Sequence, residues 1–305
     1  MDKQKTSPGE AYRQQKGFAL IITLSVLAIV IALTGVLIGY LDTARKEASE
    51  TKALVQANLY FSDVKKVLEK FKDKKALYNT LYLTPVPLQS EDGRFSLMLQ
   101  CRPLDNGVNI NWLAKENSVK MRSQYAAAQK VFDYLAEKYA LANPLRLEEM
   151  LLHAIRGTEE EEQSRFVRKN GIISYQQFAQ ILSRYQFETD DKAAGRVPWK
   201  DYFVFQPAGK RPEENLIAGD FVSRELLAAL FEIDPASLKE EWVEAEGALK
   251  TLLRAHGIPF DKQLFASEFI ERARCEVHYM YEGERFAFAF RDQEGEVSEF
   301  EFFRE

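Results

Sequence analysis

The stretch KGFALIITLSVLAIVIALTGVLIGY, residues 16–40, decides how this chain is organised. From Phe18 to Tyr40 it has 23 residues and no charged side chain. An α-helix of that length is about 34 Å long, and the hydrocarbon core of a bilayer is about 30 Å thick. Its few hydroxyl groups can bond to carbonyls of the helix backbone, so they do not oppose insertion. The stretch predicts a membrane-spanning helix; the alternative is a helix buried in a protein core.

The flanks of this segment predict its orientation. Four basic residues precede it, so the short N-terminus should stay in the cytoplasm and the C-terminal part should be exported; they are Lys3, Lys5, Arg13 and Lys16. A cleaved secretory signal has a shorter apolar core, of about 7–15 residues, followed by a small-residue cut site. No A-x-A-like site follows Tyr40. We therefore expect the helix to be retained as an anchor.

Length and composition limit the kinds of protein that this chain can be. The chain has 305 residues and a formal net charge of -5, and 46% of its residues are hydrophobic. That length suffices for one large domain or two smaller ones with cores of their own. Mild acidity gives no reason to expect nucleic acid as a partner, because nucleic acid is bound by basic patches.

Periodicity predicts a long helix and then strands. Apolar residues recur at helical steps after the span, at Leu54, Ala57, Phe61, Val64, Leu68 and Phe71. One helix from the membrane to about Lys72 explains this, and two helices meeting near Asp42 is the alternative. Residues 94–101 alternate between apolar and polar, as in a half-buried strand. Three more such runs, 275–281, 286–290 and 297–303, are separated by turns and predict an antiparallel meander.

A block with helical patterns lies between these strand regions. Apolar residues recur at steps of three and four within 125–139, and Pro144 ends that helix. Four further helices are expected over residues 145–155, 174–185, 223–231 and 235–256, with Ser174 and Ser223 as N-caps. The expected fold class is α+β, in which a long N-terminal helix packs on an antiparallel sheet and a large helical domain is inserted.

The start of the apolar segment resembles a known processing signal. A polar, basic leader is followed by Gly17, and Phe18 opens the apolar run directly. This order resembles the class III leader of type IV pilins and of type II secretion pseudopilins. In those families a prepilin peptidase cuts after the glycine and usually methylates the new N-terminal phenylalanine. The resemblance implies cleavage between Gly17 and Phe18; the alternative is a chance K-G-F junction in an ordinary anchor.

One position departs from most of that superfamily. Most members have glutamate at the fifth mature position, where it is thought to contact the free amine of a neighbouring subunit. Here that position is Ile22, so the chain is poorly suited to be a repeating shaft subunit. With a length near 300 residues, it resembles the large minor pseudopilin K of type II secretion (the GspK family), which is placed at the filament tip.

The resemblance implies a domain plan and partners. It gives a leader at 1–17, a transmembrane helix at 18–41, a pilin-like part at 42–112, an inserted all-helical (SAM-like) domain at 113–265 and closing strands at 266–305. Asn109 and Asn111 resemble an Asn-x-Asn near the entry to the insert. The implied location is the bacterial inner membrane, with the C-terminal domain in the periplasm. The implied partners are the GspI and GspJ minor pseudopilins, the major pseudopilin, prepilin peptidase and membrane lipid.

Two groups of residues are candidates for further bonds. Cys101 and Cys275 lie on the apolar side of predicted strands, so they can pair in an oxidising compartment if those strands are neighbours. The alternative is two buried thiols. Carboxylates gather around a glycine at Glu188, Asp190, Asp191 and Asp201. Since K pseudopilins bind calcium in their helical domain, these residues are a calcium hypothesis; the alternative is a solvated acidic loop, because their spacing is not that of an EF-hand.

No catalytic motif is evident in the sequence. The three histidines, His153, His256 and His278, have no neighbours at metal-ligand or triad spacing, and HExxH, GxSxG and phosphate-loop motifs are missing. We therefore expect a non-enzymatic protein. The alternatives are a minor type IV pilin that primes a pilus, and a single-span periplasmic protein that binds a ligand or acts as an enzyme.

Overall fold

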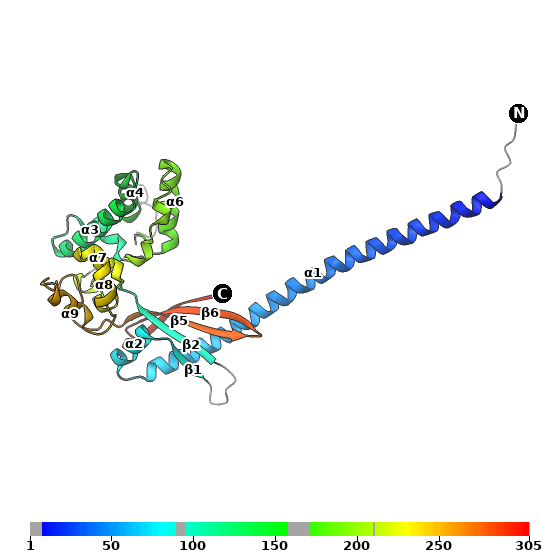
Figure 1. Cartoon of the computed structure of the whole chain (residues 1–305). Helices are drawn as coiled ribbons and strands as arrows, with labels where there is room; N and C mark the ends of the chain where they lie inside the picture. Colours follow the sequence, from blue (N-terminus) through cyan, green and yellow to red (C-terminus); the bar gives the residue numbers. More distant parts are fainter. Residues whose placement is uncertain (1–7, 90–95, 158–170, 210, 305) are drawn as a thin grey trace.

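A long helix dominates the shape of the chain. The computed structural model describes residues 8–89, 96–157, 171–209 and 211–304, with the backbone alone for residues 8–20. Helix α1 (Pro8–Lys70) is continuous over 63 residues and extends far from the folded part (Figure 1). The predicted long helix is confirmed, and the alternative of two helices meeting near Asp42 is wrong.

The second half of α1 packs on a sheet. Its buried side chains recur at helical spacing and are Ala53, Ala57, Tyr60, Val64 and Leu68. The predicted stripe was correct at Ala57, Val64 and Leu68, but Leu54 and Phe71 are exposed. Phe71 follows the last residue of α1, so it is not on the helix face that meets the sheet. Next to Leu54, the carbonyl of Ala53 accepts a hydrogen bond from the buried Tyr279 hydroxyl at 2.6 Å.

The sheet has five antiparallel strands in the order β1-β2-β5-β6-β7. They are β1 (Val86–Gln89), β2 (Ser96–Pro103), β5 (Arg272–Tyr281), β6 (Glu284–Gln293) and β7 (Glu296–Arg304). The predicted strand and the predicted meander are both confirmed. Strand β1 was not predicted, because it contains Pro87; proline is tolerated there because β1 is an edge strand. The short helix α2 (Lys74–Leu83) was not predicted either; Asp73 caps it by accepting a hydrogen bond from the amide of Ala76.

Aromatic side chains fill the space between α1 and the sheet. The ring of Phe61 contacts those of Phe288, Phe290 and Phe300, with centroids 6.2, 5.4 and 5.2 Å away. The ring of Tyr60 meets that of Tyr279 edge-on at 5.2 Å. The inward residues of the strands are therefore covered by α1, as their alternating pattern requires.

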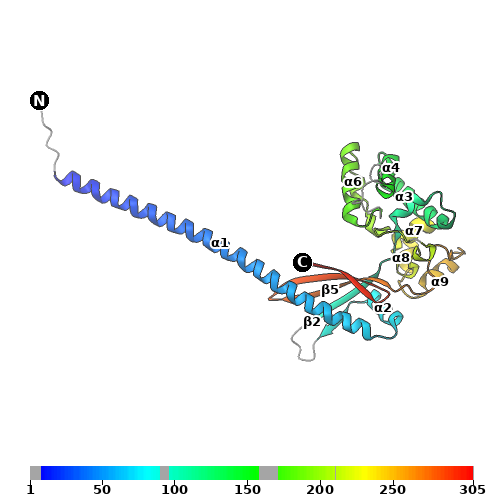
Figure 2. The ribbon, with the colours of Figure 1, turned by 180° about the vertical axis from the view of Figure 1, so that it is seen from behind.

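The segment between β2 and β5 forms a second core. We call the residues from Val108 to Phe265 the helical block, because they pack around buried side chains of their own. Its main helices are α3 (Arg122–Lys138), α4 (Pro144–Arg156), α6 (Tyr175–Thr189), α7 (Arg224–Phe231), α8 (Pro235–Glu241) and α9 (Ala248–Ala255). A parallel pair, β3 (Val108–Asn109) and β4 (Phe203–Val204), belongs to it. The block lies beyond the sheet, at the opposite end of the molecule from the N-terminus (Figure 2).

The predicted helix over 235–256 is wrong, because the structure has two helices there. Helix α8 ends where Trp242 turns inward and donates its indole N–H to the carbonyl of Val222 at 3.2 Å. Helix α9 starts after Gly247, whose φ of 79° is left-handed. The carboxylate of Asp220 accepts hydrogen bonds from the amides of Gly247 and Leu249 at 2.7 and 3.0 Å. The carboxylate of Asp220, which is distant in sequence, therefore marks the start of α9. The apolar periodicity alone predicts one continuous helix across this position.

Asn109 and Asn111 are buried and connect three segments of the helical block. The amide of Asn111 donates to the carbonyls of Ile172 and Gln206 at 2.9 and 2.8 Å, and its oxygen accepts from the N–H of Ile172 at 2.7 Å. Gly171 allows this contact, because a Cβ there would lie 2.2 Å from the Asn111 oxygen. The two asparagines thus satisfy buried backbone groups, as polar residues in a core must.

The cysteines lie at the base of the helical block. Cys101 of β2 and Cys275 of β5 are directly opposite in the strand register, are buried, and form a disulfide. Their separation in sequence is 174 residues, which includes the whole block. The bond therefore joins the strands by which the chain leaves and re-enters the sheet.

Replacing Cys101 and Cys275 together by alanine should lower the free energy of unfolding by about 2–5 kcal/mol, because the unfolded chain regains the freedom of a long loop. Denaturant titration of both proteins, with and without reductant, measures this. Reductant should destabilise the wild type and leave the double variant unchanged. Equal stability of the wild type and the variant under oxidising conditions would contradict the prediction.

Candidate functional site

From Ile21 to Leu41, α1 presents an apolar surface that no other described part of the chain covers. Its side chains from Ile21 onward are exposed, including Leu27 at 55% and Leu37 at 60%. Within the ranges that the structure describes, α1 is the one helix long and apolar enough to cross a membrane. A continuous apolar surface of this size marks a membrane or protein contact, because its exposure to water is unfavourable in free energy.

The predicted processing site lies near the start of this surface. Gly17 and Phe18 belong to α1 by their backbone, and their side chains fall outside the described residues. Ile22 is about one turn later and is 47% exposed. An aliphatic side chain at this position continues the apolar surface, whereas a carboxylate in lipid would need a cationic partner.

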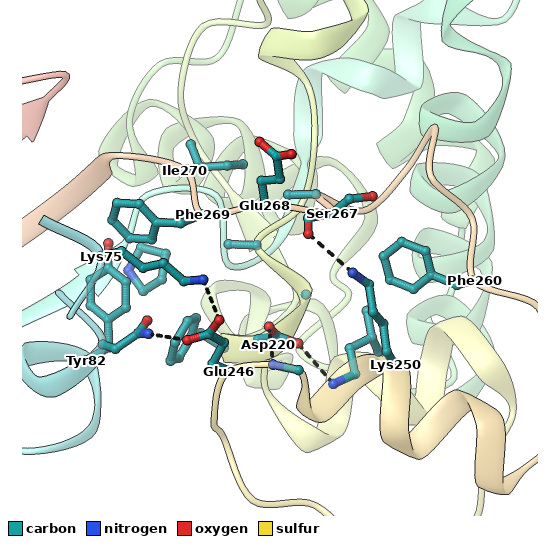
Figure 3. Close-up of a pocket in the computed structure, with 18 residues that line it drawn as sticks. Lys75, Tyr82, Asp220, Glu246, Lys250, Phe260, Ser267, Glu268, Phe269 and Ile270 are labelled. Atoms are coloured by element: carbon teal, nitrogen blue, oxygen red, sulfur yellow. Dashed lines mark hydrogen bonds and ion pairs between the residues drawn. The ribbon is translucent and has the colours of Figure 1, made fainter. Parts of the chain in front are cut away.

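A pocket lies where the helical block meets α2 (Figure 3). Its volume is about 130 Å³. It is walled by α2, by the short 3₁₀ helix η6 (Gly219–Phe221), by the start of α9 and by the segment 266–270 that leads into β5. Rings contribute much of the wall: Tyr82 meets Phe221 edge-on at 4.9 Å, and Phe260 and Phe269 line the other sides.

The polar groups of the pocket pair with one another. Glu246 forms an ion pair with Lys75 and accepts a hydrogen bond from the amide of Asn79 at 3.0 Å. On the other side of the pocket, the ammonium of Lys250 donates to the carbonyl of Ser267 at 3.2 Å (Figure 3). The contacts of Glu246 join the helical block to α2, and the contact of Lys250 joins α9 to the segment that leads into β5. Among its described lining residues the pocket has no histidine or cysteine.

Buried acids lie beside this pocket. Asp105 is 5% exposed, pairs with Arg272 at 3.4 Å and accepts a hydrogen bond from the amide of Gln206 at 2.7 Å. Burial raises the pKa of the Asp105 carboxyl, and its two partners oppose that shift. The hydroxyl of Tyr78 donates to buried Asp292, and burial together with this carboxylate raises the pKa of Tyr78. These pairs connect the end of the sheet to the base of the helical block and to α2.

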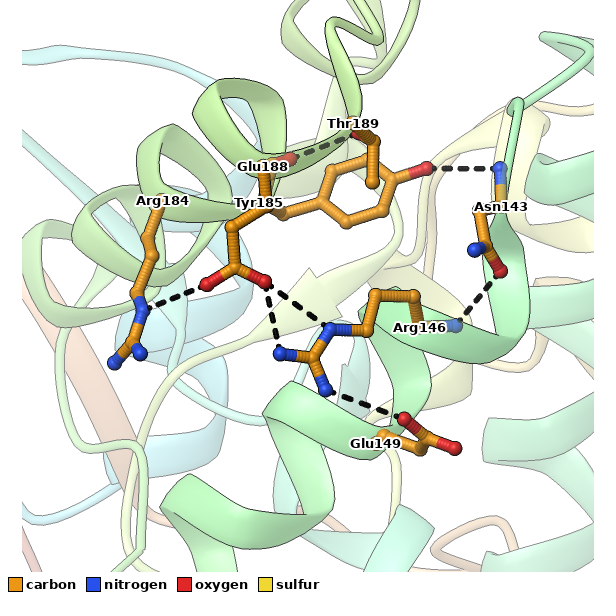
Figure 4. A network of polar contacts seen from close by, with 7 residues as sticks. All are labelled: Asn143, Arg146, Glu149, Arg184, Tyr185, Glu188 and Thr189. Carbon is orange, nitrogen blue, oxygen red and sulfur yellow. Dashed lines mark hydrogen bonds and ion pairs between the residues drawn. The ribbon is translucent and has the colours of Figure 1, made fainter.

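Glu188, from the calcium hypothesis, is bound by two arginines (Figure 4). One carboxylate oxygen accepts hydrogen bonds from Arg146 at 2.8 and 3.1 Å, and the other accepts one from Arg184 at 3.0 Å. The hydrogen bonds from Arg146, followed by the one from Arg184, lower the pKa of Glu188. Arg146 also reaches Glu149 at 3.3 Å, so the network balances two cations with two anions.

Asp191 connects the ends of α4 and α6. Its carboxylate accepts hydrogen bonds from the N–H of Ala142, the N–H of Ala193 and the hydroxyl of Tyr185, at 2.9, 2.9 and 2.8 Å. Burial would raise the pKa of Asp191, but these hydrogen bonds outweigh it and lower the pKa. The carboxylate charge of Asp191 therefore interacts with groups of the fold itself.

The structure does not bring the four predicted calcium ligands together. Asp190 ends α6 in a left-handed conformation, and Asp201 belongs to the 3₁₀ helix η4 (Trp199–Asp201), where burial and then Glu225 raise its pKa. Among the side chains that the structure describes, no group of three or more His, Cys, Asp or Glu is placed to hold a metal ion. Calcium binding remains a prediction without support from the geometry of these residues.

Comparison with known proteins finds no relative: no protein-family model and no curated protein matches the chain. A function can therefore be inferred only from the architecture and from the resemblance of residues 16–22 to a prepilin processing site. The buried pairs around Asp105 and Asp292 were not predicted. The sequence does contain a hint of the Asp292 pair. Asp292 follows Phe286, Phe288 and Phe290 at alternate positions of one strand, so its side chain faces the core, where a carboxylate needs a partner.

Replacing Asp191 by asparagine should destabilise the chain at pH 7 by about 1.5–3 kcal/mol, because hydrogen bonds to a charged acceptor are lost. The folded pKa is lowered, so this stabilisation is complete above the unfolded pKa of about 3.9 and is lost as pH falls through the folded pKa. The difference between wild type and variant should shrink toward pH 2 in denaturant titrations.

The matched control is Asp190→Asn, at the neighbouring position, where asparagine accepts the left-handed backbone. It should leave stability nearly unchanged at both pH values. A pH-independent difference between Asp191→Asn and the wild type would show that the carboxylate charge is not what stabilises this corner.

Proposed function

We propose that this chain is a non-enzymatic minor pseudopilin, most similar to K of type II secretion, that helps to start a short filament. The observation that carries the proposal is α1. It is a single helix whose first half exposes apolar side chains and whose second half packs on an antiparallel sheet. Its apolar part begins at Lys16-Gly17-Phe18, as in a prepilin.

In this proposal the N-terminus is cytoplasmic and the peptidase cuts after Gly17. Residues 18–41 then lie in the bacterial inner membrane, and the rest of the chain is periplasmic. The basic residues before the span and the disulfide after it support this orientation, because thiols are kept reduced in the cytoplasm and oxidise in the periplasm.

The pilin-like part would be α1 with the sheet, and the helical block would be the inserted SAM-like domain. The chain leaves the sheet at the end of β2 and returns at the start of β5, and the block between them has its own core. The predicted insert, residues 113–265, falls within this segment. The ion pairs and rings at the pocket would hold the insert at a constant angle on the sheet.

Two features support a place at the tip. A shaft subunit needs a contact on both sides, and Ile22 cannot supply the carboxylate that would meet the amine of a neighbour. The helical block lies at the end of the molecule away from the membrane span (Figure 1), where it would obstruct stacking of another subunit. The partners would be the GspI and GspJ minor pseudopilins beside it and the major pseudopilin below.

Processing tests the class of protein. In cells with prepilin peptidase, N-terminal mass spectrometry of the membrane protein should find Phe18 as the first residue, with a methylated amine. Replacing Gly17 by alanine should leave the leader attached, whereas the control Gly9→Ala should be processed normally. An intact Met1 in the wild type, with or without the peptidase, would contradict the proposal and favour an ordinary anchored periplasmic protein.

Deletion of the gene separates secretion from its rival, a minor type IV pilin that primes a pilus. In the proposal, exported enzymes accumulate in the periplasm of the deletion strain, and pilus-dependent motility is unchanged. Wild-type protein should restore secretion, and Gly17→Ala should not, because an uncleaved leader blocks assembly. Normal secretion together with a loss of pili would contradict the proposal and would favour a minor type IV pilin.

A further inference from the structure

The outer face of the sheet, opposite α1, has two exposed methionines close together in the strand register. In β2 the inward residues Leu97 and Leu99 are buried, and Met98 between them is 39% exposed. In β5 the inward residue Tyr279 is buried, and Met280 after it is 59% exposed. Methionine is an apolar residue, and neither side chain is needed to fill the core that lies on the other face.

A histidine lies between these methionines. His278 of β5 is directly opposite Met98 in the register, and Met280 is two residues further along the same strand. Opposite residues on one face have Cβ atoms about 4.5–5.5 Å apart, and residues two apart on a strand are about 6.6 Å apart. Methionine has three rotatable bonds and a long reach. Both sulfur atoms can therefore approach one ion beside the imidazole.

The imidazole is held in place by a carboxylate. Nε2 of His278 lies 3.2 Å from a carboxylate oxygen of Glu276, which is on the same strand and the same face. Metal-binding histidines commonly have such a partner, which orients the ring and makes it a better donor. The scaffold is rigid, because β2 and β5 are neighbours inside the sheet and the disulfide joins them three residues away from Met98 and His278.

We propose that Met98, His278 and Met280 form a binding site for a soft monovalent metal ion, Cu(I). Thioether sulfur selects Cu(I), and imidazole nitrogen also suits copper. Harder ions such as calcium and magnesium prefer oxygen donors and would not use the two thioethers. The site is independent of the membrane span and of the proposed function in secretion.

The charges around the site are compatible with a monovalent cation. Glu276 provides a negative charge beside the histidine, and Arg285 lies opposite Met280 in the register. Two neutral sulfur atoms and a neutral imidazole leave the charge of the ion as it is. A single charge costs less to place near Arg285 than the double charge of zinc or Cu(II).

Silver(I) tests the site with the disulfide intact, because it is a soft monovalent ion that needs no reductant. The full chain in detergent micelles is titrated with Ag(I) in chloride-free buffer, and the methionine ε-methyl groups are followed by NMR. One ion should bind per chain, and the signals of Met98 and Met280 should shift while those of Met121 and Met150 stay in place. Titration with Cu(I) under anaerobic conditions should show the same stoichiometry.

Variants identify the ligands. Met98→Leu and Met280→Leu conserve volume, and each should weaken Ag(I) binding by more than about 10-fold, the loss that removing even a supporting partner causes. Met150→Leu, in α4, is the matched control and should bind as the wild type does. The proposal is overturned if no stoichiometric binding occurs, or if His278→Gln abolishes binding while both leucine variants retain it, since the histidine would then bind without the sulfur atoms.

Discussion

The packing of α1 against the sheet is the contact on which the rest of the structure depends. Small residues, Ala53 and Ala57, let the helix approach the strands, and larger ones, Val64 and Leu68, fill the space further along. A fully buried side chain of the larger kind contributes about 1.5–3 kcal/mol. The sheet shields these residues on one face only, so without the helix its inner aromatic rows would be exposed to water. The helix and the inner face of the sheet thus share one hydrophobic core.

The helical block depends on the packing of α1 against the sheet, because the base of the block is attached to that sheet. Its two connections to the sheet are the end of β2 and the start of β5, which Cys101 and Cys275 join. The Asp105–Arg272 pair joins the same two connections, and the Lys75–Glu246 pair joins α2 to the block. Burial of Asp105 is costly unless its partners stay in place. The disulfide, the rings at the pocket and these polar pairs therefore orient the block, while its stability comes from its own core.

Local pattern was enough to predict α1, the central strands and most helices, because each follows from periodicity that neighbouring residues share. What could not be predicted depends on distant partners. The break between α8 and α9 needs Asp220, and Glu188 is neutralised by Arg146, which lies in another helix. A carboxylate-rich segment has the same composition whether its charges bind a metal ion or arginines. The disulfide required knowledge of strand order, which alternation alone does not provide.

The continuity of α1 has a mechanical consequence for an anchored protein. From Leu41 to Lys70 the helix contains neither glycine nor proline, which are the residues that usually bend helices. Gly35 and Gly39 lie within the apolar half, so the residue types that favour a bend are missing from the part of α1 that joins this half to the sheet. A tilt or rotation of α1 at Leu41 is therefore carried along the helix to the sheet, and the base contacts carry it on to the helical block. If the apolar half is held in a membrane, its orientation therefore reaches the far end of the chain.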